Sequence, residues 1–253
     1  MKNVLVTGGA SGIGKGIAEH LAQQNYQILV TDLSKSAAQE TAAEIGRKGG
    51  EAKGYALDVT QAESIAQLLA DLQGRSVDIL INNAGIQHVA PLEDFPMDKW
   101  QFLLDVMLVG VARLTQAILP SMKTNDFGRI INIGSIHSLV ASPFKSAYVS
   151  AKHGLLGFSK VVALETAEHN ITINTVCPAY VKTPLVEKQI AAQAKEHGIS
   201  EQEVIEHIML EPMPKKKFIG LDELAGTCQF LMEPAAKNIT GQTITLDGGW
   251  VAR

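Results

Sequence analysis

The chain has 253 residues, of which 46% are hydrophobic, and a formal net charge of −4. This length suits one α/β domain or two small ones, and the apolar content allows a large core. The weakly acidic charge excludes the basic footprint of a nucleic-acid-binding protein, and the three lysines at 215–217 are too short a run to supply one.

The two cysteines and the N-terminal residues are typical of a protein from a reducing compartment. Cys177 and Cys228 lie far apart without metal-ligand spacing, so we expect small packing residues and no metal site. The apolar run after Met1 meets Gly8 too early for a signal peptide, and we expect no apolar stretch that approaches the length of a membrane span. We therefore expect a soluble, cytoplasmic protein without membrane or nucleic-acid partners.

Short apolar runs alternate with helical patterns along the chain. Strands are predicted at 4–6, 28–30, 79–81, 130–133 and 171–173, and helices within 14–24, 36–48 and 61–72. Strands that are apolar throughout are typical of parallel sheets with helices on both faces. The sequence therefore predicts a single α/β domain over 1–253, built on a Rossmann-type, doubly wound parallel sheet.

One segment, residues 184–217, departs from this alternation. It is rich in Ala, Gln, Lys and Glu, follows the strand near Ile173, and ends around Pro212 and Pro214. Ligands of open α/β sheets bind beyond the carboxyl ends of the strands. A helical insertion at such an end is predicted to be a substrate lid, the alternative being a surface insertion without a role.

A glycine-rich turn at residues 7–14 follows the first strand and opens the first helix. Gly8, Gly12 and Gly14 permit a tight turn, and the helix N-terminus offers free N–H groups to a pyrophosphate. Asp32 follows the second strand, where a carboxylate accepts the ribose hydroxyls of NAD and repels the extra phosphate of NADP. The pattern predicts an NAD site, although the nearby cations Lys15 and Lys35 leave NADP open, and the alternative is a glycine turn that binds no ligand.

Polar or small residues also end two further predicted strands. Asp58 and Val59 end the third strand, and residues 82–85 (Asn-Asn-Ala-Gly) end the fourth. An adenine and a ribose would lie at this edge of the sheet. Taken separately, each of these strings is as consistent with an ordinary turn as with a cofactor site.

Tyr148 and Lys152 stand four residues apart, and Ser135 precedes the tyrosine by 13 residues. Positions i and i+4 share one face of a helix. A phenol has a pKa of about 10 and a nearby cation lowers it, which is the requirement for a general acid/base at an alcohol or carbonyl. The alternative interpretation of this spacing alone is a plain helix surface.

In combination these motifs resemble the short-chain dehydrogenase/reductase family, from the first strand to Asp247-Gly248-Gly249. Within that family, the chain looks most similar to bacterial D-3-hydroxybutyrate dehydrogenases at 83–88, 139–142, 145–148, 183–190 and 247–250. The resemblance implies NAD-dependent oxidation of D-3-hydroxybutyrate to acetoacetate, as in ketone body metabolism. It also implies a homotetramer built through long helices around 100–123 and 150–169.

The resemblance also implies a role for each matching residue. Tyr148 exchanges the alcohol proton, Ser135 holds the substrate oxygen, and Lys152 binds the nicotinamide ribose and lowers the tyrosine pKa. The cofactor-binding positions are Gly8, Ser11, Gly12, Ile13, Gly14, Asp32, Asp58, Val59, Asn83, Ala84, Gly85, Tyr148, Lys152, Pro178, Val181 and Thr183. The substrate-binding positions are Gln87, Ser135, His137, Lys145, Tyr148 and Gln189.

The substrate set makes chemical sense for a small carboxylate. Lys145 and a protonated His137 supply positive charge, and Gln87 and Gln189 supply amide donors. Each of these residues could instead be an ordinary loop or surface side chain. Two broader alternatives are a dehydrogenase or reductase for another hydroxy acid, a sugar or an acyl thioester, and a dinucleotide-binding protein that has lost catalysis.

The chain departs from the family pattern at two positions. Met107 stands where the family has a catalytic Asn, and a thioether cannot replace the hydrogen bonds of an amide. Met107 keeps the role only if the family's Asn acts through its backbone carbonyl. Ala179 replaces the usual Gly after Pro178, which is tolerable if the backbone needs no positive φ. Trp250 is expected to be a packing residue.

Overall fold

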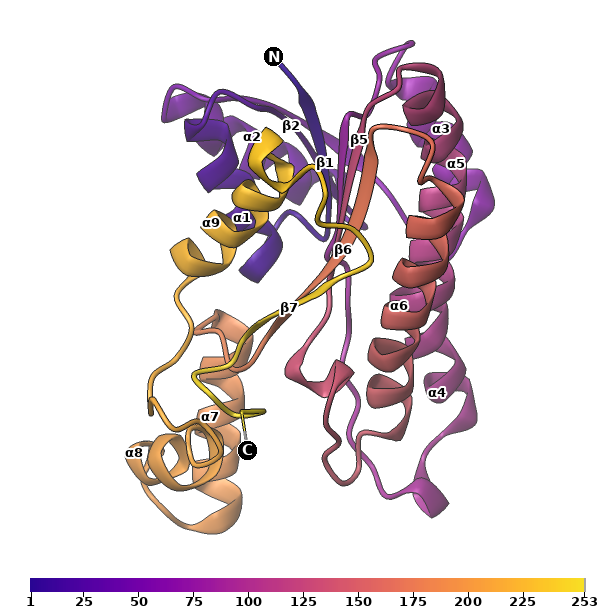
Figure 1. The fold of residues 1–253 in the computed structure, drawn as a ribbon. Helices are drawn as coiled ribbons and strands as arrows, with labels where there is room; N and C mark the ends of the chain where they lie inside the picture. The colour runs from indigo at the N-terminus through magenta and orange to yellow at the C-terminus, as the bar shows by residue number, and fades with distance from the viewer. Residues whose placement is uncertain (253) are drawn as a thin grey trace.

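The computed structural model describes residues 1–252, apart from the side chains of Pro184 and Leu185. Its strands are all parallel and form one seven-stranded sheet in the order β3-β2-β1-β4-β5-β6-β7 (Figure 1). The strands are β1 (Asn3–Thr7), β2 (Gln27–Asp32), β3 (Glu51–Ala56), β4 (Ile79–Asn82), β5 (Gly128–Ile133), β6 (Ile171–Pro178) and β7 (Thr243–Leu246). The strand order reverses direction between β1 and β4, so the predicted doubly wound sheet is confirmed.

Helices cover both faces of the sheet, as Figure 1 shows. The first layer contains α1 (Gly12–Gln23), α2 (Lys35–Arg47) and α9 (Leu221–Met232). The second layer contains α3 (Ala62–Asp71), α4 (Met97–Leu104), the π-helical turn η2 (Asp105–Val109), α5 (Gly110–Thr124) and α6 (Ser146–Glu165). Short 3-10 turns lie at η1 (Leu92–Asp94), η3 (Ile136–Ser138) and η5 (Pro234–Ala236).

The alternation of side chains along β1 shows why the central strands are apolar throughout. Val4 and Val6 pack against the α1, α2 and α9 layer, whereas Leu5 packs against the opposite layer. All three are fully buried. Each face of a central strand meets a helix, so polar alternation along it would place unpaired groups in a core.

The edges of the sheet are where the sequence prediction is least accurate. β3 ends at Ala56, two residues before Asp58, and its residues alternate between exposed and half-buried. β7 is a further strand that the sequence pattern did not predict, and it is also largely half-buried. Edge strands have one covered face or less, so their sequences lack the continuous apolar run of a central strand.

The expectation that no apolar stretch reaches the length of a membrane span was wrong. The helical segment Met97–Thr124 is long and apolar enough to cross a membrane by length and composition. In the structure its residues Leu103, Leu114 and Ile118 are buried in the core cluster against the sheet. The same composition therefore serves as a core helix of this α/β fold.

Residues 184–217 form a helical body beside the C-terminal end of the sheet, at the lower left of Figure 1. It contains α7 (Pro184–His197), α8 (Glu201–Val204) and the π turn η4 (Ile205–Met209). Ile190, Val204 and Met209 form a small apolar cluster of its own. A parallel bridge between Val181 and Ile219 joins its entry to its exit.

A buried ladder of polar side chains crosses the middle of the sheet. The amide of Asn82 donates to Asn132 at 2.8 Å, and Asn132 donates to the Ser159 hydroxyl at 2.9 Å. Ser159 in turn lies 2.9 Å from the Thr175 hydroxyl. The ladder joins β4, β5 and β6 to α6, and Asn132 is fully buried at its centre.

Replacing Asn132 by Ala should lower the free energy of unfolding by about 1–3 kcal/mol, because Asn82 and Ser159 would lose buried partners. Urea unfolding followed by circular dichroism measures this change. Asn238→Ala, at an exposed loop position, is the control and should stay within about 0.5 kcal/mol of the wild type. Equal stability of the two variants would contradict a stabilising role for the ladder.

Candidate active site

The fold brings Ser135, Tyr148 and Lys152 together at the carboxyl end of β5. Ser135 follows the strand and caps η3, where its hydroxyl accepts the His137 backbone N–H at 3.2 Å. Tyr148 lies in the first turn of α6 and Lys152 one turn later. The ammonium of Lys152 lies 5.7 Å from the centre of the Tyr148 ring and donates to the Ile133 carbonyl at 2.7 Å.

Burial dominates the electrostatics of this trio. Burial raises the pKa of Tyr148 above its ordinary value, even though part of the side chain stays accessible, and the hydrogen bond with Ser135 opposes this. Burial also lowers the pKa of Lys152 to about 8. The lowering of the tyrosine pKa by Lys152 that the i, i+4 spacing suggested is not found in this structure, where desolvation has the largest effect on the phenol. The protonated phenol is the prevailing form.

The glycine loop has the shape of an anion cradle. Gly8 and Gly12 have φ values of 61° and 53°, and a Cβ on Gly12 would meet nothing within 4 Å. A Cβ on Gly14 would lie 2.3 Å from the Gly8 carbonyl oxygen, so helix α1 can approach the loop only with glycine there. Ser11, the N-cap of α1, makes no capping bond with its side chain. The open space above Gly12 and the helix N-terminus suit a pyrophosphate.

The loop after β4 lies against this cradle. The Asn83 amide donates to the carbonyl oxygens of Thr7 and Gly8 at 2.9 and 3.2 Å. The Thr7 hydroxyl accepts the backbone N–H groups of Asn83 and Ala84, both at 2.9 Å. The Asn-Ala-Gly string therefore holds the glycine loop in place, a structural task that its sequence alone did not reveal.

The two acids predicted at strand ends are held by local hydrogen bonds. The Asp32 carboxylate accepts the N–H groups of Ala10 at 3.3 Å and Ser34 at 3.4 Å. The Asp58 carboxylate accepts both the N–H and the hydroxyl of Thr60, at 2.9 and 2.7 Å. Both carboxylates lie at the carboxyl ends of the strands, as the glycine loop does.

Further predicted cofactor residues lie near the carboxyl ends of the same sheet. Val59 is buried after Asp58, and half-buried Ile13 lies in the first turn of α1. Pro178 ends β6, Val181 is buried at the bridge to Ile219, and Thr183 caps α7 by accepting the Val186 N–H at 3.3 Å.

His137 is a neutral imidazole in this structure, which corrects the positive charge considered from the sequence. Burial, with the positive charge of Lys145 as a second cause, lowers its pKa to about 4. The ring lies 2.7 Å from the Ser142 hydroxyl through Nε2 and 3.4 Å from the Ser135 hydroxyl through Nδ1. Before an anion binds, His137 can therefore orient a substrate by hydrogen bonding, but it carries no positive charge at pH 7.

Lys145, directly before α6, is the charged side chain that contributes most to lowering the pKa of His137. Burial lowers its pKa, and among the described residues no carboxylate forms a salt bridge with it. The loop carrying Gln87 is tied to this region because the Ala90 N–H donates to the Phe144 carbonyl at 3.0 Å. Half-buried Gln189 lies on α7, and in the described part of the chain no hydrogen bond joins it to Gln87, His137 or Lys145.

Two aromatic residues that the sequence did not assign line the same region. The Trp250 ring meets His137 edge-on, with 6.2 Å between ring centres, and stacks on Tyr180 at 6.2 Å and 26°. Trp250 thus packs, as expected, but it packs against a predicted substrate residue. No sequence signal placed it there, because the contact joins residues more than one hundred positions apart.

The structure shows different environments for Met107 and Ala179, the two departures from the family pattern. Met107 lies inside the π turn η2, and its side chain is buried with Sδ 3.6 Å from where a Gly85 Cβ would be. Its side chain is therefore a packing group, and it cannot make the hydrogen bonds of an amide. Ala179 is not among the described non-glycine residues with positive φ, so its methyl group adds no backbone strain.

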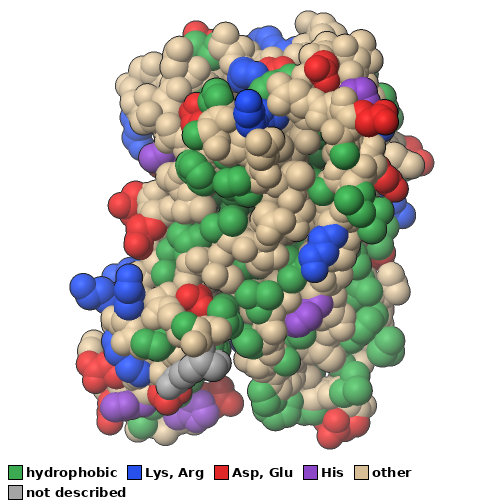
Figure 2. Space-filling model, viewed as in Figure 1, with side chains coloured by type: hydrophobic (Ala, Val, Ile, Leu, Met, Phe, Trp, Pro, Cys, Tyr) green, Lys and Arg blue, Asp and Glu red, His purple; other side chains and the backbone are tan. Residues whose placement is uncertain are grey.

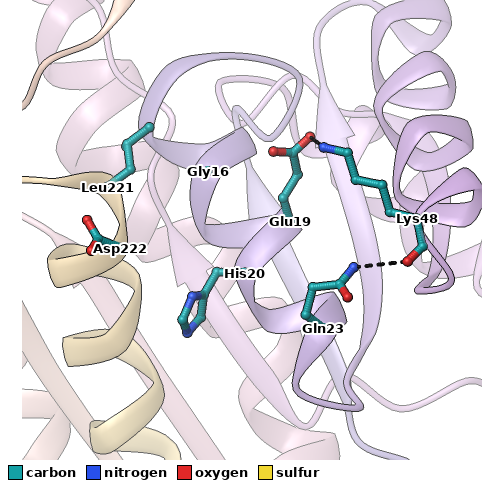
Figure 3. A pocket seen from close by; sticks show the side chains of 7 residues that line it. All are labelled: Gly16, Glu19, His20, Gln23, Lys48, Leu221 and Asp222. Carbon is teal, nitrogen blue, oxygen red and sulfur yellow. Dashed lines mark hydrogen bonds and ion pairs between the residues drawn. The ribbon is translucent and has the colours of Figure 1, made fainter.

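A separate surface hollow of about 450 Å³ lies between α1, the end of α2 and the start of α9 (Figure 3). Several of its polar groups pair with one another: Lys48 binds Glu19 at 3.0 Å, and the Gln23 amide reaches the Lys48 carbonyl at 3.4 Å. None of the predicted site residues lines it. The candidate active site therefore lies at the carboxyl ends of the strands, beside Ser135, Tyr148 and Lys152, and not in this hollow.

Known proteins match the chain over its whole length. Residues 2–194 match the family described as short chain dehydrogenase. The chain is 43% identical to the D-beta-hydroxybutyrate dehydrogenase of Rhizobium meliloti, covering 100% of this chain and 99% of that protein. It is 45% identical to the protein of the same name from Cupriavidus necator, covering 100% and 98%.

A solved structure agrees with this relationship. The crystal structure of sorbitol-6-phosphate 2-dehydrogenase from Erwinia amylovora superposes with a TM-score of 0.92 at 29% identity. The match covers 98% of this chain and 99% of that one.

His137 predicts a defined pH dependence of stability. The unfolded chain binds this proton below about pH 6.5, and the folded chain only below about pH 4. The unfolded state therefore takes up more protons in that window, and stability falls as the pH is lowered through it. Between pH 7 and 5 the wild type should lose up to about 2 kcal/mol more than His137→Gln.

Urea unfolding at both pH values measures the difference. His197→Gln, at an exposed position of α7, is the matched control and should keep the wild-type dependence. The same pH dependence in His137→Gln and wild type would contradict a buried, neutral His137.

Proposed function

The chain belongs to the short chain dehydrogenase family, and from this premise we propose that it oxidises D-3-hydroxybutyrate to acetoacetate with NAD. One observation carries the substrate assignment. Beside the trio of Ser135, Tyr148 and Lys152 lies Lys145, a half-buried cation without a carboxylate partner among the described residues. A small anionic substrate would supply that partner. The two relatives named for this substrate share 43% and 45% identity with the chain.

NAD fits the cofactor edge of the sheet. Gly8, Ser11, Gly12, Ile13 and Gly14 would hold the pyrophosphate, and Asp32 would accept the ribose hydroxyls. The nearby Lys15 forms an ion pair with Glu44, which leaves it poorly placed to attract the extra phosphate of NADP. The remaining cofactor contacts are assigned to Asp58, Val59, Asn83, Ala84, Gly85, Pro178, Val181 and Thr183.

When bound, NAD supplies the acceptor for the hydride of the substrate's C3 carbon. In oxidation, Tyr148 reacts as the phenolate, which forms when the phenol releases its own proton to solvent, and its Oη then takes the hydroxyl proton while the Ser135 hydroxyl holds the same oxygen. In reduction, the phenol returns the proton to the ketone, and its raised pKa keeps that proton in place at neutral pH. The Lys152 ammonium offsets the negative charge that develops on the phenol.

The substrate carboxylate is assigned to Lys145, with hydrogen bonds from His137, Gln87 and Gln189. Gln189 lies on α7, so we assign residues 184–217 to a lid whose closure brings this amide to the anion and excludes water. The separate apolar cluster of Ile190, Val204 and Met209 supports movement as one body. In the view of Figure 2 a notch separates this body from the loops on its right.

The proposal includes a homotetramer that works in the cytoplasm in ketone body metabolism. Val161 and Leu164 on α6 are 53% and 79% exposed, and Phe102 on α4 is 48% exposed. These exposed apolar side chains on α4 and α6 support assembly through this face of the molecule. Light scattering coupled to size exclusion gives the mass; a monomer at micromolar concentration would contradict this part.

The first prediction of activity is NADH formation from D-3-hydroxybutyrate, followed by absorbance. A panel of C4 to C6 hydroxy acids and both enantiomers of the C4 acid tests the substrate. A higher kcat/KM for another acid would move the assignment within the family. Tight binding of NAD without turnover across the panel would favour the non-catalytic alternative.

Lys145→Ala tests the carboxylate site. We expect KM for 3-hydroxybutyrate to rise about ten- to hundred-fold, because a charge-assisted hydrogen bond is lost. The KM for the neutral alcohol 2-butanol should change far less. Lys160→Ala, at an exposed position of the same helix, is the control. Equal effects of Lys145→Ala on both substrates would remove this residue from the anion site.

Met107→Asn tests whether the side chain matters to the proton path. We expect kcat to stay within about three-fold of the wild type, because the path uses the backbone. Stability should fall by about 1–3 kcal/mol, because a buried amide replaces a thioether. Met122→Asn, the same change at another fully buried methionine, is the control for stability. A ten-fold rise in kcat for Met107→Asn alone would show that an amide was needed.

A further inference from the structure

The last residues of the described chain form a tight turn held by one carboxylate. Asp247 follows β7, and its two carboxylate oxygens accept the backbone N–H groups of Gly249 at 2.9 Å and Val251 at 2.8 Å. Gly248 and Gly249 between them have φ values of 59° and 90°. We call residues 247–250 the C-terminal turn.

This turn contacts the exit of the lid segment. The Lys215 N–H donates to the Gly248 carbonyl at 3.1 Å. A Cβ on Gly248 would lie 3.2 Å from Met213 Cε, and one on Gly249 would lie 3.4 Å from Pro214 Cγ. The glycines therefore let the turn lie directly against the residues through which the lid returns to the core.

The turn also contacts the entry of the lid and the substrate region. The residue before it, Leu246, accepts the Ala179 N–H at 2.8 Å, and Trp250 stacks on Tyr180. Trp250 also meets His137 edge-on, and the ring nitrogens of His137 lie near the Ser135 and Ser142 hydroxyls. One short turn thus joins both ends of the lid to a residue assigned to the substrate.

We infer that Asp247 is a positioning residue: it holds Trp250 against His137 and couples the position of the lid to the geometry of the substrate-anion site. This role rests on the proposed function, because it concerns how the hydroxy acid is held. Both carboxylate oxygens accept backbone N–H groups of the turn itself. Asp247 acts through the turn, since without its two hydrogen bonds the glycines would be free to adopt many conformations.

The chain has two tryptophans, so Trp100→Phe leaves Trp250 as the only fluorescent indole. In this background, Asp247→Ala should shift the emission of Trp250 to longer wavelength without any ligand, because the indole leaves its ring contacts for water. The KM for D-3-hydroxybutyrate should rise about five- to twenty-fold while the KM for NAD stays within about two-fold. A purely structural role would not separate the two KM values.

Asp247→Asn keeps one acceptor oxygen and should give an intermediate effect, and it decides by the same measurements if Asp247→Ala does not fold. Asp126→Ala is the matched control, because this loop carboxylate also accepts a backbone N–H, from Asn170 at 3.0 Å, but does so at the opposite end of the sheet. It should change neither the emission nor the KM values.

Unchanged Trp250 emission in Asp247→Ala would overturn the inference, as would shifted emission with an unchanged KM for the acid. Absence of turnover in the wild type would defeat the proposed function instead. In that case His137→Ala in the Trp100→Phe background still tests the contact: if the emission of Trp250 stays the same there, the coupling to His137 is refuted.

Discussion

The hydrogen bond from the Lys152 ammonium to the Ile133 carbonyl, at 2.7 Å, is the constraint on which the site depends. It joins α6 to the last residue of β5. Ser135 lies two residues beyond that carbonyl, and Tyr148 lies one helical turn before that lysine. A single bond therefore sets the position of the phenol relative to the serine hydroxyl. The buried ladder through Asn132 and Ser159 holds the same helix and strand together deeper in the core.

Desolvation decides the charge state of the groups around this bond. It lowers the pKa of Lys152, Lys145 and His137 and raises that of Tyr148, so each group is shifted toward its neutral form. Holding the two lysines protonated in this region costs desolvation free energy. Among the described residues, no carboxylate pairs with either lysine to offset that cost. An anionic substrate would offset the desolvation cost of both lysine ammonium groups. The same burial thus favours a small acid and keeps the tyrosine proton available for reduction.

Met107 stands where the resemblance to the family implies an Asn, and its side chain serves the packing of the core. The π turn at η2 is present around Met107, and the thioether fills space below Gly85. A side-chain amide at this position would face that apolar packing, whereas the backbone of the turn is independent of residue type.

The sequence by itself determined the central strands, the glycine loop, the acids at the strand ends and the Tyr148–Lys152 pair. These depend on local periodicity or short spacing, which one helix or one strand-turn unit enforces. The tertiary structure alone decided that burial outweighs charge at Tyr148, that His137 is neutral, and that Trp250 lies against His137. Desolvation and contact between distant segments arise only when separate elements pack, so no local pattern of residues carries them.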